Sequence, residues 1–206
     1  MYNIKPTIFV LFIAIIITCR GNGVISEDEY KIFRIVLGGI RLELNDNHGN
    51  NSSDSTIIKK DQIIIEDKTH LDYHGDLKDV LNVLEFKMKE MDHETLIDFK
   101  NKNKYSSKIE NHFKDGNYTL LDSDSLKIWK KADIVGSSPW PKIYEKYKNF
   151  CALIMLSRVG LNSNKTQAIV YIGYLKGGLN GLGSYFFLIK KDNNWQIKDS
   201  MLAWIS

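Results

Sequence analysis

The last quarter of the chain decides its fold. It reads LSRVGLN (residues 156–162), TQAIVYIGYLKGGLNGLGSYFFLIKK (166–191) and DNNWQIKDSMLAWIS (192–206). β-Branched and aromatic residues dominate these runs, and glycine, asparagine and aspartate interrupt them, which is typical of strands joined by turns. We therefore expect strands at residues 151–158, 166–175, 184–191, 194–199 and 202–205. The Asp192-Asn193 pair between two of them predicts a tight hairpin.

Helical patterns dominate the part of the chain before these strands. Ser26 and Glu29 have the spacing of a capping box, and the helix that they begin is expected to stop at Gly38-Gly39. Apolar spacing and turn residues predict the remaining elements: helices at 77–91, 124–131 and 139–148, a short helix after Asp92, strands at 56–66 and 118–121, and a polar loop at 43–55.

This order of elements favours an α+β fold over a parallel βαβ sheet. We predict a single α+β domain over residues 26–206, in which N-terminal helices and a short strand region pack on a C-terminal antiparallel β-meander. The helical part extends to about residue 150 and the meander covers about 151–206.

The two central strands of the expected sheet are apolar on both sides, around Ile169–Ile172 and Tyr185–Ile189. Each face of such a sheet needs a cover, unless one face lines a groove. The helices at 77–91 and 139–148 are expected to cover one face. The sequence does not identify what covers the other.

The N-terminus has the pattern of an export signal. After Lys5, Ile8–Ile17 form ten consecutive apolar residues, fewer than the roughly 17–25 of a membrane-spanning helix but within the about 7–15 of a signal peptide. Ile16-Ile17-Thr18-Cys19 then resembles a lipobox, at which bacterial lipoprotein signals are cut and the cysteine is acylated. We expect a signal peptide at 1–18, a lipid on Cys19 and a tether at 19–25. The alternative is secretion after cleavage near Gly21 or Gly23.

Charge and composition narrow the classes of function. The formal net charge is +3, and acidic residues interrupt the lysines near residues 100–114, so nucleic-acid binding is not expected. Cys151 lies in an apolar run and is expected to be a buried thiol. His70 and His74 are the only clustered metal-type ligands, without a second pair at suitable spacing, so neither a metal nor a cofactor is expected.

Four residues are candidate ligand contacts. Arg158 follows an apolar strand, where an arginine pairs with a carboxylate or binds an anion, and Asn162 follows shortly after. Gly178 and Gly181 belong to the block Gly177–Gly183, which leads into a strand, whereas a dinucleotide-binding loop leads into a helix. We expect this block to be a flexible hairpin loop with positive φ angles, or a loop whose backbone approaches a ligand.

The stretch from Trp140 to Ser206 resembles a family of uncharacterised exported bacterial proteins. The shared pattern comprises Tyr144 and Tyr147, Ser157 to Asn162 (SRVGLN), Thr166 to Tyr171 (TQAIVY), Gly177 to Gly183, Lys190-Lys191, Trp195 to Ile197 and Trp204 to Ser206. The resemblance covers about a third of the chain. Relatives often carry two cysteines in the glycine-rich loop, which this chain lacks. The resemblance implies an envelope or secreted protein and brings no catalytic residues.

These observations favour an envelope-anchored or secreted binding domain without catalytic activity. Its expected partners are the membrane, through the lipid anchor, and a protein or a small ligand. One alternative is a hydrolase with a site near Arg158, the 177–183 loop or His70 and His74. The other is a structural or inhibitor-like module.

Overall fold

The computed structural model describes residues 23–46, 62–70, 77–113, 118–131 and 138–206. Its helices are α1 (Glu27–Asp46), α2 (Leu77–Lys87), α3 (His93–Lys102), α4 (Ser123–Lys131) and α5 (Trp140–Lys146). Its strands are β1 (Gln62–Glu66), β2 (Tyr118–Leu121), β3 (Phe150–Leu156), β4 (Gly160–Leu161), β5 (Gln167–Gly177), β6 (Asn180–Lys191) and β7 (Asn194–Ile205). The fold is α+β, which confirms the prediction.

The described strands form one mixed sheet in the order β2-β1-β3-β5-β6-β7, with β4 paired to β5. The pairs β3–β5, β5–β6 and β6–β7 are antiparallel, as predicted for the C-terminal meander. The pairs β1–β2 and β1–β3 are parallel, which the sequence reading did not anticipate. Parallel neighbours need long crossover connections, here those containing α2–α3 and α4–α5, so no local turn signal marks these pairs.

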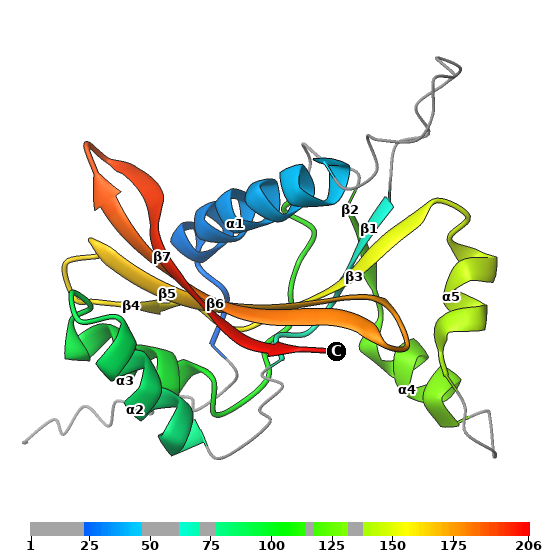
Figure 1. Cartoon of the computed structure of the whole chain (residues 1–206), viewed down its shortest axis with the longest axis horizontal. Coiled ribbons are helices and arrows are strands. Elements are labelled where there is room, and N and C mark those ends of the chain that lie inside the picture. The colour runs from blue at the N-terminus through cyan, green and yellow to red at the C-terminus, as the bar shows by residue number, and fades with distance from the viewer. Residues whose placement is uncertain (1–22, 47–61, 71–76, 114–117, 132–137) are drawn as a thin grey trace, which may run out of the picture.

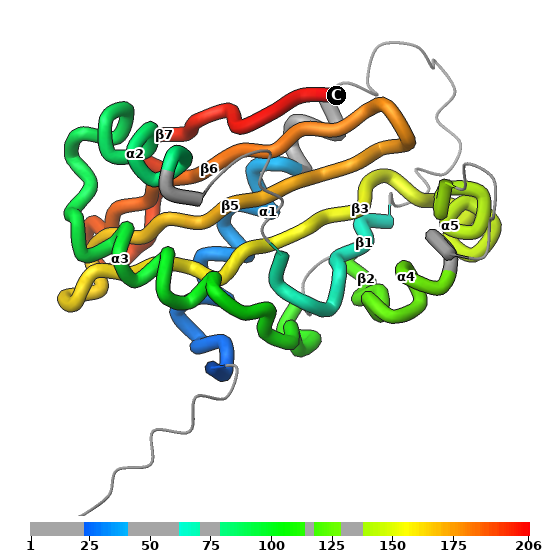
Figure 2. Tube along the Cα trace, turned by 90° about the horizontal axis from the view of Figure 1, so that it is seen from below, coloured from blue at the N-terminus to red at the C-terminus, as the bar shows by residue number. Residues whose placement is uncertain are grey.

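Helices cover both faces of the sheet (Figures 1 and 2). Ile169, Tyr171 and Phe187 face α2 and α3, whose Leu84 and Phe99 belong to the same buried cluster. At the other end of this face, α5 packs on β1 and β3. The predicted cover by the helices at 77–91 and 139–148 is therefore confirmed.

The second face of the sheet is covered by α1. Its apolar residues join the largest buried cluster, with members Phe33, Val36, Leu37, Ile40, Ile63, Ile65, Ile154, Val170, Leu188 and Trp195. The chain thus supplies the cover that the sequence reading left open, and the groove proposed as an alternative for this face is filled by α1.

α1 is longer than predicted. The capping box at its start is confirmed, since Ser26 N donates to Glu29 Oε2 over 2.9 Å and Glu29 N to Ser26 Oγ over 3.4 Å. The helix does not stop at Gly38-Gly39 but continues to Asp46, so it includes the start of the loop predicted at 43–55; residues 47–55 lie outside the described residues. Burial of Val36, Leu37 and Ile40 outweighs the roughly 1 kcal/mol cost of a helical glycine.

β7 is one strand rather than the two predicted at 194–199 and 202–205. Phe187 pairs with Asp199 while Leu188 pairs with Ile197, so Lys198 is an extra, bulged residue. A second bulge lies at Ala203, between the pairs Gly183–Trp204 and Ser184–Leu202. Bulges change which side of a strand its residues face, so a strict period of two does not describe β7.

The two C-terminal turns differ in their agreement with the prediction. Asp192 and Asn193 have φ angles of 49° and 63°, which confirms the tight hairpin. The glycine block is not the flexible loop of positive φ that we expected. Gly177 ends β5, Gly178 and Leu179 form the turn, and Gly181 and Gly183 lie inside β6.

Other element boundaries moved by a few residues. α2 ends at Lys87 rather than at residue 91, although Met88 and Met91 remain buried. The part of the predicted strand 56–66 that falls on described residues is β1. Among the helices of the described residues, none combines the length and apolarity that spanning a membrane requires.

Candidate functional site

Arg158 is the most strongly bound side chain among the sequence candidates. It lies between β3 and β4, and its side chain is 5% exposed. Its Nε and Nη2 donate to the two carboxylate oxygens of Glu29 over 2.8 and 3.0 Å. Its Nη1 donates to Gly23 O over 2.7 Å and to Ser107 Oγ over 2.9 Å, and Nη2 also donates to Val24 O over 3.3 Å. A guanidinium has five N–H donors, and these five hydrogen bonds give each of them an acceptor within the chain.

Glu29 is matched to this arrangement from the other side. Besides the two bonds from Arg158, its carboxylate accepts the N–H of Ser26 at 2.9 Å, the hydroxyl of Ser26 at 3.1 Å and the N–H of Val159 at 3.2 Å. Burial on its own raises the pKa of Glu29, but the bonds from Arg158 and Ser26 outweigh it and hold that pKa below its ordinary value. One carboxylate therefore caps α1 and neutralises the buried guanidinium.

The ion pair of Arg158 and Glu29 fastens the start of the domain. We call this pair, together with Gly23, Val24 and Ser107, the Arg158 clamp. It joins α1, the β3–β4 connection and the loop that contains Ser107. Ile25 is buried, so the end of the predicted tether 19–25 already packs on the domain. No N–H of Arg158 is left for a ligand, and its role among the described residues is internal.

The residues around Arg158 have structural tasks as well. Ser157 Oγ accepts the N–H of Tyr171 over 2.8 Å and donates to Arg158 O over 2.8 Å. A Cβ on Gly160 would lie 2.5 Å from Thr95 O and 2.7 Å from Phe99 Cα, so only glycine lets α3 pass this closely. In the SRVG sequence, Ser157 thus serves through the hydrogen bonds of its hydroxyl, Arg158 through a buried ion pair, and Gly160 through the close approach of α3.

Asn162 closes the loop between β4 and β5. Its Oδ1 accepts the N–H groups of Thr166 and Gln167 over 2.8 and 3.0 Å, and its Nδ2 donates to Asp92 Oδ2 over 2.8 Å and to Thr166 Oγ1 over 3.0 Å. These are the four hydrogen bonds that an amide side chain can make with two donors and two lone pairs. Asn162 therefore ties this loop to the start of α3.

The glycines form a seat for Trp204. A Cβ on Gly181 would lie 3.1 Å from Trp204 Cζ3, and one on Gly183 would meet the indole Nε1 and lie 2.7 Å from the Tyr171 hydroxyl. Gly173 lines the same seat, 3.6 Å from Trp204 Cζ2. Trp204 Nε1 donates to the Tyr171 hydroxyl over 2.8 Å. We call this arrangement the Trp204 seat. The indole of Trp204 occupies the space next to Gly181 and Gly183 in which a ligand of the predicted loop would have to lie.

Gly178 lies in the β5–β6 turn against α5. A Cβ there would be 3.6 Å from Trp140 Nε1, an ordinary contact, and Tyr144 donates its hydroxyl to Lys176 O next to this turn over 3.1 Å. Trp140, Tyr144 and Phe150 form an aromatic cluster beneath it. The turn is thus packed on α5.

The remaining candidates fall at the edge of the described residues or outside them. His70 is exposed, whereas His74 and Cys19 lie outside the described residues. Cys151 is half-buried in β3 rather than fully buried. Within the described part of the chain, no three histidine, cysteine or acidic side chains gather as a metal site would require.

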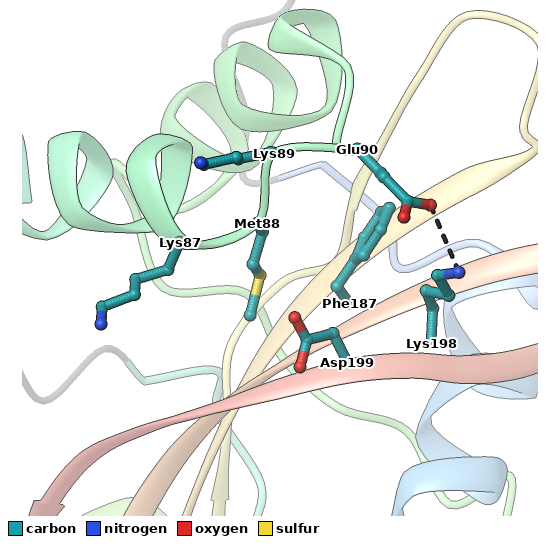
Figure 3. A pocket seen from close by; sticks show the side chains of 7 residues that line it. All are labelled: Lys87, Met88, Lys89, Glu90, Phe187, Lys198 and Asp199. Carbon is teal, nitrogen blue, oxygen red and sulfur yellow. Dashed lines mark ion pairs between the residues drawn. The ribbon is translucent and has the colours of Figure 1, made fainter.

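A hollow of about 170 Å³, which no sequence pattern predicts, lies between the turn after α2 and the strands β6 and β7 (Figure 3). Its lining consists of Lys87, Met88, Lys89, Glu90, Phe187, Lys198 and Asp199. Met88, Phe187 and Asp199 converge on its centre, while Lys87 and Lys89 point away. Lys198 Nζ lies 3.3 Å from Glu90 Oε2 at one side. The bulged residue Lys198 and its neighbour Asp199 both belong to this lining, whereas strict period-two alternation would place neighbouring residues on opposite faces of the strand.

A second hollow, of about 190 Å³, lies beside the Arg158 clamp. Its lining consists of Gly23, Val24, Ile25, Tyr30, Lys108 and Glu110. Tyr30 accepts the N–H of Glu110 with its hydroxyl over 2.8 Å, and burial raises the pKa of this phenol. The hollow therefore opens where the chain enters the domain.

Comparison with known proteins adds no relative to this picture. No protein-family model, curated protein or solved structure matches the chain. The resemblance to exported bacterial proteins therefore stays a prediction.

Proposed function

We propose that this chain is an exported domain that a lipid on Cys19 attaches to a membrane and that acts by binding a protein partner. The Arg158 clamp carries the proposal. It fixes Gly23 and Val24, four and five residues after the lipobox-like cysteine. A domain that is held through its N-terminal segment needs that segment fastened to its core, and a buried arginine with all its donors engaged does this.

Attachment is tested by replacing Cys19 with serine in a bacterial host. We expect the parent chain to incorporate labelled fatty acid and to sediment with membranes, and Cys19→Ser to lose both properties. Cys151→Ser is the matched control, since it removes the other cysteine and should keep the label. Equal labelling of the parent and Cys19→Ser would exclude the anchor.

The hollow of Figure 3 supports the binding role. Its volume of about 170 Å³ is smaller than the roughly 300–1,000 Å³ of small-molecule pockets, so it fits one protruding group of a partner. Its floor of Met88 and Phe187 is apolar, with the carboxylate of Asp199 beside it. The aliphatic stem and cationic head of a lysine or arginine match this combination. Phe86, 69% exposed and one residue before the lining, is the kind of aromatic that anchors interfaces.

The binding role is tested with a short arginine-containing peptide titrated into the isotope-labelled protein. We expect shifts of the Phe187 and Asp199 amide resonances, and weaker binding by Asp199→Asn. Asp192→Asn is the matched control, because Asp192 is an exposed carboxylate in the β6–β7 turn outside the hollow. Equal weakening by both variants would show that the peptide responds only to net charge.

The hydrolase alternative has less support from the geometry. Its first location is Arg158, whose donors are all engaged internally, and its second is the 177–183 block, which seats Trp204. His70, the described member of its third location, is exposed. A hydrolase needs polar groups that converge on a substrate, and the polar groups at the first two locations bind each other.

A further inference from the structure

The Arg158 clamp determines where the chain leaves the domain. Nη1 of Arg158 holds Gly23 O at 2.7 Å and Ser107 Oγ at 2.9 Å. Gly23 therefore lies beside the loop that follows α3. The other end of this loop is also fixed, because Asn103 Nδ2 donates to Arg158 O over 3.0 Å and Asn103 Oδ1 accepts the N–H of Arg158 over 2.7 Å.

The segment between the proposed lipid and this point is short. Residues 20–22 separate Cys19 from Gly23, and an extended chain advances at most about 3.6 Å per residue, so the two Cα atoms lie within about 14 Å of each other. The radius of gyration of a domain of about 180 residues is about 16 Å. A tether shorter than this radius keeps one face of the domain at the membrane.

The surface around Gly23 carries side chains suited to a lipid headgroup layer. Val24 is 88% exposed and Tyr105 is 71% exposed. Lys104 and Lys108 are also exposed, and none of the ion pairs found between described residues uses either of them. We call Val24, Lys104, Tyr105 and Lys108 the entry surface. Tyrosine favours the membrane–water interface, and lysines close to it are attracted to anionic lipids.

Acidic groups near the entry surface are partly compensated. Asp98 lies 2.8 Å from Lys102 Nζ, and Glu110 lies 3.5 Å from His112 Nε2, a contact that is an ion pair only when this imidazole is protonated. Lys108 and Val24 line the hollow of about 190 Å³ together with Glu110. The entry surface thus combines Val24 and Lys108, which line one hollow, with Lys104 and Tyr105, which lie on the loop that Arg158 holds through Asn103 and Ser107.

We propose that the entry surface rests on a membrane of anionic phospholipid, with Tyr105 at headgroup depth and Lys104 and Lys108 against the phosphates. This inference rests on the proposed lipid at Cys19. It orients the domain so that the β5–β6 turn, which lies far from the start of α1 in both Figure 1 and Figure 2, points away from the lipid.

The test uses the full acylated chain with Cys151→Ser, reconstituted into vesicles of phosphatidylethanolamine and phosphatidylglycerol. A polarity-sensitive fluorophore is attached at Tyr105→Cys or, as the control, at Leu179→Cys, since Leu179 is 89% exposed in the β5–β6 turn. We expect the fluorophore at 105 to shift to the blue and to lose intensity to a lipid-borne quencher. The fluorophore at 179 should keep its emission in solution.

Charge gives a second arm to the experiment. Lys104→Gln with Lys108→Gln should reduce the quenching at 105 in vesicles that contain phosphatidylglycerol and leave the fatty-acid label unchanged. Equal emission at 105 and 179 in a chain that carries the lipid overturns the entry surface and leaves the anchor intact. A chain without fatty-acid label overturns both, so the two failures are distinguishable. Circular dichroism of each variant verifies that it is folded.

Discussion

The Arg158 clamp and the Trp204 seat join distant parts of the chain by different physical means. The clamp links residues up to 135 positions apart through a buried ion pair in which every donor of Arg158 has an acceptor. The seat links β5, β6 and β7 through shape, with glycines that leave room for an indole and one hydrogen bond of 2.8 Å. The clamp is therefore sensitive to lost charge and the seat to added volume.

The clamp should show the largest effect. Glu29→Gln keeps the shape of the side chain but leaves the buried guanidinium of Arg158 without its counter-charge. Breaking a buried pair in this way costs about 3–5 kcal/mol, measured as the free energy of unfolding by urea. Glu27→Gln is the control, since its carboxylate is exposed and pairs at the surface with Arg34, where solvent screens the pair, so a much smaller loss is expected. Similar losses in both variants would contradict the special role of the clamp.

The seat should respond next. Gly183→Ala places a methyl group against Trp204 Cε2 at 2.6 Å and the Tyr171 hydroxyl at 2.7 Å, and overpacking of this kind costs about 1–3 kcal/mol. Gly178→Ala adds the same methyl group to the same hairpin at an ordinary distance of 3.6 Å from Trp140, and should leave thermal stability nearly unchanged. A seat that tolerates Gly183→Ala as well as the turn tolerates Gly178→Ala would not depend on its glycines.

Acid should reduce the difference in unfolding free energy between the parent protein and Glu29→Gln. Because the pKa of Glu29 is held below its ordinary value in the folded state, its contribution is fully present above the unfolded pKa and is lost as pH falls through the folded pKa. The difference in unfolding free energy between the parent and Glu29→Gln should therefore be greatest near neutral pH and narrow progressively below pH of about 4.3, the ordinary value for glutamate. Urea titrations at several pH values measure it; a constant difference would mean that Glu29 is not ionised in the clamp.

The features that sequence could predict are local ones. The Ser26–Glu29 capping box and the Asp192-Asn193 hairpin each depend on residues a few positions apart, and both are present. The parallel pairs of β1 could not be predicted, because nothing in a single short strand specifies a partner that follows two or more helices later in the chain. Similarly, the capping box predicts the role of Glu29 at the start of α1, but no sequence pattern indicates that the same carboxylate also binds Arg158.

The Trp204 seat lies between these cases. Gly181 and Gly183 are two residues apart and so face one side of a strand, which is a signal for a large side chain above them. Both glycines were predicted to lie in a loop, where this spacing has no such meaning. The hollow of Figure 3 was hidden for another reason, because the bulge at Lys198 changes the facing of the residues that follow it.

The smallest effect should come from Gly38, and its sign separates a required glycine from a tolerated one. Gly38 lies inside α1, and a Cβ there would meet nothing within 4 Å. Alanine restricts the unfolded chain and favours the helix, so Gly38→Ala should raise the free energy of unfolding by about 0.5–1 kcal/mol. The same substitution at Gly183 should lower it. Thermal melts should show opposite shifts of the melting temperature for the two variants. Gly183 is required because the indole of Trp204 occupies the space of a Cβ, whereas Gly38 is tolerated because the sheet contacts of its neighbours offset its weak helix propensity. Loss of stability at both sites would reveal an unseen contact at Gly38 and remove this distinction.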